Sequence, residues 1–237
     1  MSSLRFHKSN LHLAVAAGDL TGELTQAEVT QALSDFADAA VHSALKAALK
    51  ARGISGDGLF IVALGKMGAG ELNYSSDIDI VAMYDPDIFD PGEGSKGQTA
   101  MRVIQDMTRI LEERTGDGYV FRVDLRLRPD PSSTPVCVST HMAETYYESV
   151  GQNWERMAWI KARACAGDLV AADNFIKQMQ PFVWRKHLDY WAIGDIHAIK
   201  HMVNAKVGDP SLANPAADVK LGPGGIREIE FLSLIHI

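Results

Sequence analysis

The segment from residue 59 to residue 84 constrains the fold of this chain most strongly. It begins with a short apolar run, LFIVAL, which glycines bound on both sides. A glycine-containing loop, residues 65–76, follows, and the chain then reads DIDIVAMY from Asp77 to Tyr84. Short apolar runs between turn residues are typical of buried strands, and alternating polar and apolar residues are typical of half-exposed strands. The segment therefore predicts two strands joined by a loop.

Helical patterns lie on both sides of this segment. Thr25 and Glu28 form a capping box, and apolar residues then recur at helical spacing until Gly53. A second helical pattern runs over residues 101–111. After it, the sequence YVFRVDLRLRP, residues 119–129, alternates polar and apolar residues and predicts a third strand. The predicted order is therefore helix, strand, strand, helix, strand.

The character of the sequence changes near residues 130–140. Residues 1–135 carry the mixed pattern, whereas residues 136–237 read as helical and rich in aromatic residues. With 46% hydrophobic and 22% charged residues, the composition is that of a globular protein. We therefore expect an α+β fold in which helices flank a small mixed sheet in residues 1–135, followed by a mostly helical domain in residues 136–237.

Charge and cysteine content argue against several classes of partner. The 237 residues include 30 acidic and 23 basic side chains, a formal net charge of −7. Such a chain is poorly suited to sequence-independent binding of nucleic acid or anionic membranes. Cys137 and Cys165 lack metal-ligand spacing, and no apolar run reaches the roughly 18 residues of a membrane span. We expect a cytoplasmic protein that binds neither nucleic acid nor membrane.

Two aspartates at the start of the second strand carry the first chemical signal. Residues two apart in a strand share a face, so the carboxylates of Asp77 and Asp79 project together while Ile78 and Ile80 face a core. Adjacent carboxylates repel each other unless a cation or a proton lies between them, and a hard divalent cation such as Mg²⁺ would satisfy them. The alternative is a solvated acidic strand end, because Asp-x-Asp patterns are common.

The loop before these aspartates favours a phosphate-binding site. Gly65 lacks a Cβ atom, so a phosphate could come close to the backbone there. Successive N–H groups and a helix start after the turn would form an anion site, to which Lys66, Ser75 and Ser76 add donors. The loop is neither a Walker A nor a G-x-G-x-x-G motif. With the acidic pair, it predicts a triphosphate or phosphodiester site.

The third predicted strand adds one carboxylate and several guanidinium groups on one face. By alternation, Arg122, Asp124, Arg126 and Arg128 share that face, and the intervening apolar residues share the core face. One interpretation is a cross-strand salt-bridge ladder. The other is that Asp124 completes a three-carboxylate metal site, while Arg126 and Arg128 bind phosphate through their planar forks.

This set of residues resembles the nucleotidyltransferase superfamily shared with DNA polymerase β. The superfamily pattern is an apolar residue, a glycine, a small or polar residue, a spacer, Asp-x-Asp, and a third Asp on a later strand. The matching positions here are Leu64, Gly65, Lys66, Asp77, Asp79 and Asp124. Lys66 stands where the superfamily usually has serine, which leaves its own role open.

Four ordered strings resemble one family more closely, that of glutamine synthetase adenylyltransferase/adenylyl-removing enzymes. They are GKMGAGELNYSSDIDI, FRVDLRLRP, NWERMAWIKAR (residues 153–163) and KLGPGGIREIEF (residues 220–231). The family carries two related halves, and one Asp-x-Asp unit of this kind is present here. The chain therefore resembles part of one half. Its GGIREIEF string resembles the N-terminal half, which in the family removes AMP. Its ending, LSLIHI, departs from the family and suggests a truncation or a sequence artefact.

The resemblance implies metal-dependent transfer of AMP to or from a tyrosine of glutamine synthetase, with removal by phosphorolysis that yields ADP. It implies that Asp77 and Asp79 hold two Mg²⁺ ions and that Asp124 holds the catalytic one. ATP, ADP and phosphate would be substrates or products. Glutamine synthetase would be the partner, under regulation by a PII-type signalling protein.

Other polar residues are weaker candidates. We expect Glu155, Arg156, Lys161 and Arg163 to lie on the solvated face of a helix, although the family match also suggests nucleotide or phosphate contacts for Lys161 and Arg163. Two further acidic residues and a histidine pair at helical spacing are expected to be structural, without a zinc ion. These are Glu228, Glu230, His197 and His201.

Two other functions remain open. The chain could be another nucleotidyltransferase of the same fold, acting on a small molecule or a different protein. It could also be a non-catalytic, nucleotide-sensing module. Three intact carboxylates argue against the module, because a sensor need not keep them all.

Overall fold

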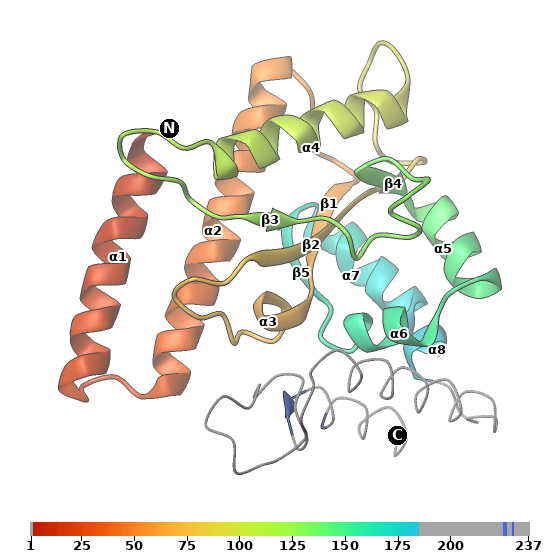
Figure 1. Ribbon diagram of the computed structural model, residues 1–237. Helices are drawn as coiled ribbons and strands as arrows, with labels where there is room; N and C mark the ends of the chain where they lie inside the picture. Colours follow the sequence, from red (N-terminus) through yellow and green to blue (C-terminus); the bar gives the residue numbers. More distant parts are fainter. Residues whose placement is uncertain (1, 185–224, 227–228, 230–237) are drawn as a thin grey trace.

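The computed structural model describes residues 2–184 together with residues 225, 226 and 229. In this part of the chain, helices flank a β-sheet (Figure 1). The helices are α1 (Ser2–Thr21), α2 (Gln26–Arg52), α3 (Gly65–Gly68), α4 (Lys96–Glu112), α5 (Thr140–Ser149), α6 (Asn153–Trp159), α7 (Leu169–Gln178) and α8 (Gln180–Val183). The strands are β1 (Leu59–Ala63), β2 (Ile78–Tyr84), β3 (Val123–Asp124), β4 (Cys137–Ser139) and β5 (Arg163–Gly167).

The sheet is mixed, with β2 joining its parallel and antiparallel parts. β1 pairs antiparallel with β2 on one edge and with β5 on the other. On its far edge, β2 pairs in parallel with two short strands, β3 near its start and β4 near its end. This arrangement confirms the expected α+β fold with a small mixed sheet flanked by helices.

Helices cover both faces of the sheet, so all five residues of β1 are buried. Alternate residues of this strand belong to two hydrophobic clusters. Leu59 and Ile61 pack with residues of α1, α2 and α4, whereas Phe60 and Val62 pack with residues of α5, α6 and α7. Figure 1 shows α1 and α2 on the left of the sheet and α5 to α8 on its right.

The elements with the clearest local signals form as predicted. Thr25 caps α2 in the expected box with Glu28, and Gly53 ends the helix in the left-handed conformation at φ 66°. The helical pattern at residues 101–111 lies within α4. The two strands predicted over residues 59–84 are β1 and β2.

The third predicted strand is much shorter than expected. Residues 119–129 alternate like a strand, but only Val123 and Asp124 form β3. The carboxylate of Asp124 accepts a hydrogen bond from the backbone N–H of Arg126 at 2.8 Å, which turns the chain out of the sheet. Leu125 and Leu127 then pack in different hydrophobic clusters, so the predicted common core face is wrong.

Two further findings differ from the sequence-based expectation. The first 21 residues contain α1, a helix that was not predicted. The boundary predicted at residue 135 does not coincide with a break in the sheet, because β4 and β5 follow it and pair with β2 and β1. Among the described helices, none combines the length and apolar character that crossing a membrane requires.

Several predictions fall on residues outside the described part of the chain. They concern the histidine pair, the two late glutamates and the last six residues. These are His197, His201, Glu228, Glu230 and residues 232–237.

Candidate active site

The sheet brings two of the three predicted carboxylates into register. Asp79 on β2 and Asp124 on β3 are paired Cα partners of neighbouring parallel strands. Asp77 lies one residue before β2, and the backbone N–H of Ile78 donates to the carbonyl of Arg122 at 3.0 Å. Side chains at paired positions of adjacent strands stand on the same face. The predicted proximity of Asp79 and Asp124 is thus a feature of the sheet itself.

The buried residues around Asp79 fix its position. Ile78 and Ile80 are fully buried, which aims Asp79 toward the opposite face of the strand. The backbone carbonyl of Asp79 also accepts a hydrogen bond from the N–H of Leu64 at 2.9 Å. This bond joins Asp79 to the residue where the glycine-containing loop begins.

Gly65 leaves room for a carboxylate. Its φ is 53°, in the left-handed region that favours glycine. A Cβ atom at Gly65 would lie 2.5 Å from Oδ2 of Asp79, closer than atoms can approach. The sequence suggested that this glycine makes space for a phosphate. The structure shows that it makes space for the side chain of Asp79.

An arginine pairs with Asp77. The Nε group of Arg122 donates to the carboxylate of Asp77. The same guanidinium donates to the carbonyl of Ser75 at 2.7 Å and to the hydroxyl of Tyr119 at 2.9 Å. Arg122 therefore ties the end of the loop to the strand that carries Asp124.

A second arginine pairs with Asp124. Nε of Arg126 lies 3.0 Å from each carboxylate oxygen of Asp124, and its Nη2 lies 2.5 Å from Oδ2. These hydrogen bonds hold the pKa of Asp124 below its ordinary value, despite partial burial. Asp124 raises the pKa of Arg126, and the charges of Asp79 and Asp77 raise it further. All three carboxylates therefore act on one guanidinium.

The carboxylates do not form a ready-made metal centre. Within the described part of the chain, no three histidine, cysteine, aspartate or glutamate side chains are arranged to hold a metal ion. Asp77 and Asp124 are instead engaged by Arg122 and Arg126. Arg126 is 84% exposed, so its side chain can leave Asp124 without losing buried contacts.

The other predicted phosphate ligands, in the glycine-containing loop, have different environments. Lys66 is exposed on α3, which is a single turn, so any helix-terminal field there is small. The hydroxyl of Ser76 donates to the side chain of Asn73, and Ser75 contributes its carbonyl to Arg122. These groups line the loop next to the carboxylates, and Lys66 is the exposed cation among them.

Arg128 has a different environment from the other arginines of its segment. Its guanidinium donates to the backbone carbonyls of Leu125, Pro131 and Thr134, at distances of 2.8 to 3.3 Å. These bonds close the turn that follows β3. They favour a structural role for Arg128 over the phosphate contact that the sequence suggested.

The expectation for the four polar residues near α6 is wrong. Helix α6 ends at Trp159, and Arg163 begins β5 instead of continuing the helix. Glu155 and Arg156 are buried, with 1% and 2% exposure. Arg163 makes a bidentate ion pair with Asp38 of α2. No local sequence pattern indicates this pair, because its members lie 125 residues apart.

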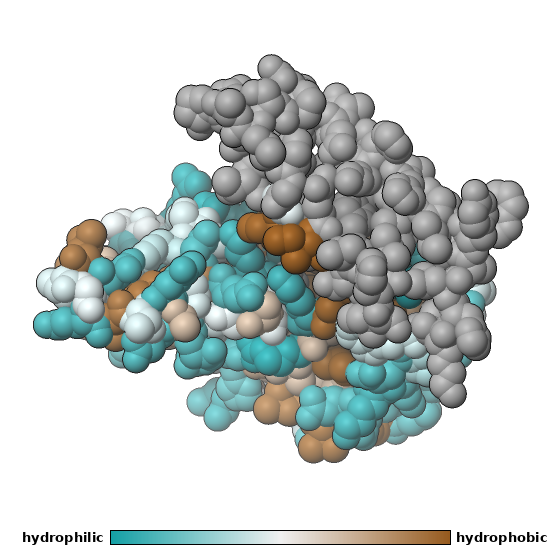
Figure 2. Space-filling model, turned by 90° about the horizontal axis from the view of Figure 1, so that it is seen from below, coloured by the Kyte–Doolittle hydropathy of each residue, from teal (hydrophilic) through white to brown (hydrophobic). Residues whose placement is uncertain are grey.

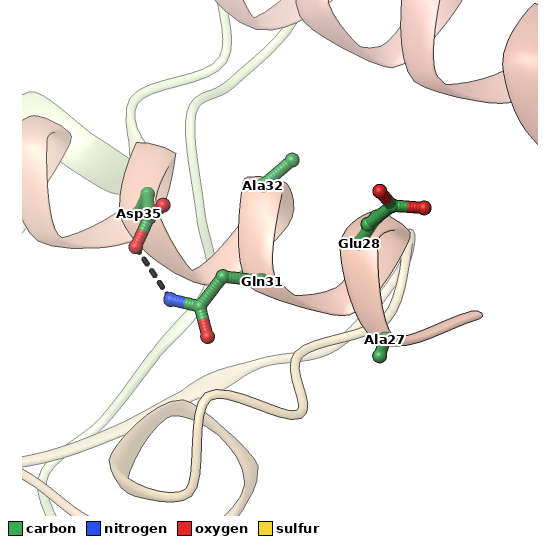
Figure 3. A pocket seen from close by; sticks show the side chains of 5 residues that line it. All are labelled: Ala27, Glu28, Gln31, Ala32 and Asp35. Atoms are coloured by element: carbon green, nitrogen blue, oxygen red, sulfur yellow. Dashed lines mark hydrogen bonds between the residues drawn. The ribbon is translucent and has the colours of Figure 1, made fainter. Parts of the chain in front are cut away.

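Two surface hollows lie on the described part of the chain. One, of about 460 Å³, is lined by a single face of α2 between Ala27 and Asp35 (Figure 3). Another, of about 590 Å³, lies beside α4 and includes Thr108 and Leu125. Among the described residues visible in Figure 2, hydrophilic ones predominate and hydrophobic ones form small groups. Neither hollow includes a predicted site residue, so the carboxylates mark the candidate site better than surface shape does.

Comparison with known proteins decides the family. Residues 1–178 match the family model of glutamate-ammonia ligase adenylyltransferase. The chain belongs to this family. It is 52% identical over 96% of its length to a bifunctional glutamine synthetase adenylyltransferase/adenylyl-removing enzyme from Caulobacter vibrioides, and 49% identical over 98% of its length to one from Rhizobium meliloti. A relative of the same name from Rhodopseudomonas palustris is 48% identical over 98% of the chain.

The match to these adenylyltransferases covers only part of them. The chain spans about a quarter of the length of the curated relatives, 24% and 25% for the first two. Family membership confirms the resemblance that the four ordered strings carry to glutamine synthetase adenylyltransferase/adenylyl-removing enzymes.

Proposed function

We propose that this chain carries out metal-dependent nucleotidyl transfer on glutamine synthetase, removing AMP from a tyrosine or adding it. Phosphorolysis would remove the AMP as ADP. The observation that carries the proposal is the register of Asp79 and Asp124 on adjacent strands, next to a glycine loop. Membership in the adenylyltransferase family supports the substrate class. A PII-type regulator and a cytoplasmic location belong to the same proposal.

The donor chemistry fits a hard divalent cation such as Mg²⁺. Asp77, Asp79 and Asp124 offer only carboxylate oxygens, the ligands that Mg²⁺ prefers. Asp79 and Asp124 would hold the ion together, and Asp77 would join them once Arg122 moves. When bound, Mg²⁺ supplies charge neutralisation at the phosphate oxygens. Until then, the hydrogen bonds from Arg126 lower the pKa of Asp124 and keep this carboxylate ionised.

The residues of the chain would position the reacting groups for in-line displacement at phosphorus. In the removing direction, an oxygen of inorganic phosphate forms a bond to the AMP phosphorus, and the bond from phosphorus to the tyrosine oxygen breaks. The tyrosine oxygen takes up a proton, and ADP leaves. Arg126 and Lys66 would bind the phosphate oxygens. In the adding direction, Asp124 would accept the tyrosine proton, and its lowered pKa keeps it ionised.

The test is incubation of the chain with adenylylated glutamine synthetase, Mg²⁺ and phosphate, with ADP release as the measurement. We expect ADP to appear and EDTA to stop it. Asp124→Asn should lower turnover more than nucleotide binding. Nucleotidyl transfer to another acceptor, without action on glutamine synthetase, would contradict the substrate assignment. Nucleotide binding without any Mg²⁺-dependent turnover would indicate a sensing module instead.

A further inference from the structure

Arg163 connects three parts of the structure through a single guanidinium group. Its Nη1 and Nη2 atoms lie 2.5 and 3.1 Å from the two carboxylate oxygens of Asp38 on α2. Its Nη2 also donates to the carbonyl of Met67 at 3.0 Å, and its Nε donates to the carbonyl of Gly68 at 3.3 Å. One edge of the planar fork therefore engages a carboxylate, while the carbonyls belong to the end of α3.

The turn that Arg163 engages is pressed closely against the sheet. A Cβ atom at Gly68 would lie 2.0 Å from the carbonyl oxygen of Lys161 and 2.8 Å from that of Ala63. No side chain fits in that space, so α3 packs directly on the backbone at the ends of β1 and β5. Carbonyls at a helix end need donors from outside the helix. Arg163 donates to the carbonyls of Met67 and Gly68, and the N–H of Gly70 also donates to that of Met67 at 3.2 Å.

The opposite end of α3 touches the candidate site. Gly65, its first residue, packs against the carboxylate of Asp79, and Lys66 follows it. A shift of the turn toward Asp79 would bring the backbone of Gly65 against Oδ2. A shift away would remove the wall on which this carboxylate rests. Contacts therefore run without a break from Asp38, through Arg163 and α3, to Asp79.

We propose that Arg163, held by Asp38, is a positioning residue that sets the place of α3 and thereby of Asp79 and Lys66. This inference rests on the proposed nucleotidyl transfer. It assigns Arg163 no contact with the nucleotide, in contrast to the possibility raised by the sequence. Arg163 instead acts through the turn that lies between it and the carboxylates.

The structure offers a closely matched control on the same helix. Arg52 of α2 pairs with Asp106 of α4, with Nε and Nη2 at 3.0 and 2.5 Å from one carboxylate oxygen. The side chains of both pairs are comparably exposed, 38% and 25% for Arg163 and Asp38 against 31% and 25% for Arg52 and Asp106. Loss of either pair removes a similar ion pair, but only Arg163 reaches α3.

The experiment compares Arg163→Lys, Asp38→Asn and Arg52→Gln in kcat, in KM for phosphate, and in amide hydrogen exchange. Lysine keeps the charge of Arg163 but cannot fork between a carboxylate and two carbonyls. We expect kcat to fall roughly tenfold to hundredfold in Arg163→Lys, since small displacements of catalytic groups have effects of that size. The KM for phosphate of Arg163→Lys should change by less than about threefold. The double variant Arg163→Lys/Asp38→Asn should have nearly the same kcat as Arg163→Lys alone, because both substitutions break the same ion pair. Arg52→Gln should leave kcat within about twofold of wild type, because surface pairs far from a site contribute little.

Hydrogen exchange keeps the test independent of the proposed activity. The amides of residues 65–76 should exchange faster in Arg163→Lys and in Asp38→Asn than in wild type. In Arg52→Gln, their exchange rates should equal those of wild type. If residues 65–76 of Arg163→Lys exchanged at the wild-type rate, the positioning role would be overturned, whether or not the chain is active. A kcat no lower than that of Arg52→Gln would also overturn it. Absence of wild-type turnover, with faster exchange in the Arg163 variant, would count against nucleotidyl transfer and leave the anchoring of α3 supported.

Discussion

Two arginines in this protein make hydrogen bonds in contrasting environments, one exposed to solvent and one buried. Arg126, at the carboxylates, is 84% exposed and pairs with Asp124. Arg156, on α6, is 2% exposed and donates to the carbonyls of Phe182 and Val183 at 3.0 and 3.2 Å. The first can exchange its partner for a ligand, because water takes over its hydrogen bonds. The second cannot, because its side chain is buried and its hydrogen bond to Val183 is shielded from water.

The difference separates charges that can act on a ligand from charges that hold the fold. An exposed ion pair contributes little to stability, so opening it for a substrate or a cation is inexpensive. A buried guanidinium leaves several unsatisfied groups behind when it is removed. We therefore expect substitutions near β3 to change kinetics and substitutions in α6 to change stability.

Asp79→Asn should show the largest effect. Asparagine keeps the shape of the side chain but removes the charge that would hold the cation, so turnover should fall about a thousandfold. The free energy of unfolding should stay close to that of wild type. Steady-state kinetics and urea unfolding measure the two quantities. Asp87→Asn, at an aspartate that is 80% exposed in another loop, is the control, and it should retain wild-type turnover.

Arg156→Met should show the opposite pattern. Methionine fills much of the space but leaves the carbonyls of Phe182 and Val183 without their donor, so the free energy of unfolding should drop by about 3 kcal/mol. Arg109→Met removes an arginine that is 72% exposed. This substitution should change the free energy of unfolding by less than about 0.5 kcal/mol. Equal effects of the two substitutions in urea unfolding would contradict the distinction between the two surroundings.

Arg126→Gln should have a moderate effect on binding. Loss of the guanidinium should raise KM for phosphate roughly tenfold, because charge-assisted bonds to phosphate are strong. The pKa of Asp124 should rise toward its ordinary value, which carboxyl carbon NMR can follow. A carboxyl with a lowered pKa adds stability above its unfolded-state pKa and loses it as the pH falls through the folded-state value. The loss of stability at acidic pH should be smaller in Arg126→Gln than in wild type. An unchanged pKa of Asp124 in this variant would show that the ion pair does not form.

Glu155→Gln should have the smallest effect, visible in the pH dependence of stability. Burial raises the pKa of Glu155, against the hydrogen bonds from Gln152 and Tyr146, and its Oε1 atom has no hydrogen-bond partner among the described residues. A carboxyl with a raised pKa contributes stability below its unfolded-state pKa and loses it as the pH rises through the folded-state value. Wild type should therefore lose stability relative to Glu155→Gln as the pH rises above the ordinary pKa of a glutamate. Parallel curves of unfolding free energy against pH would show that Glu155 is ionised as easily in the folded protein.

Local sequence signals predicted the elements that they fully determine. The cap at Thr25, the stop at Gly53 and the helical spacing between them specify α2 without help from the rest of the chain. The alternation around Asp79 likewise predicted that Ile78 and Ile80 are buried, although Val81 and Met83 on the opposite face are buried too. The position of Asp124 beside Asp79 was one of two interpretations of the sequence, and the resemblance favoured it, because strand register is not encoded in spacing alone.

Features that depend on distant contacts could not be predicted from the sequence. β3 ends early because the side chain of Asp124 turns the backbone, although its pattern continues as a strand. Arg163 and Asp38 meet only because α2 and β5 pack together. The burial of Arg156 depends on carbonyls that lie 26 and 27 residues further along the chain. A charged residue is expected to be exposed unless it is paired. Arg156 is buried instead, because the tertiary structure supplies carbonyl acceptors for its guanidinium.

The parallel pairing of β2 and β3 also makes the proposed nucleotidyl transfer depend on completed tertiary folding. Parallel neighbours need a long crossover, and here α4 lies in it, between Asp79 and Asp124. A chain emerging from the ribosome cannot bring these aspartates together until the crossover has closed over the sheet. A population that keeps its helices but loses tertiary packing should lose nucleotide chemistry as a unit. Turnover would then serve as a sensitive reporter of native assembly, more so than helix content measured by circular dichroism.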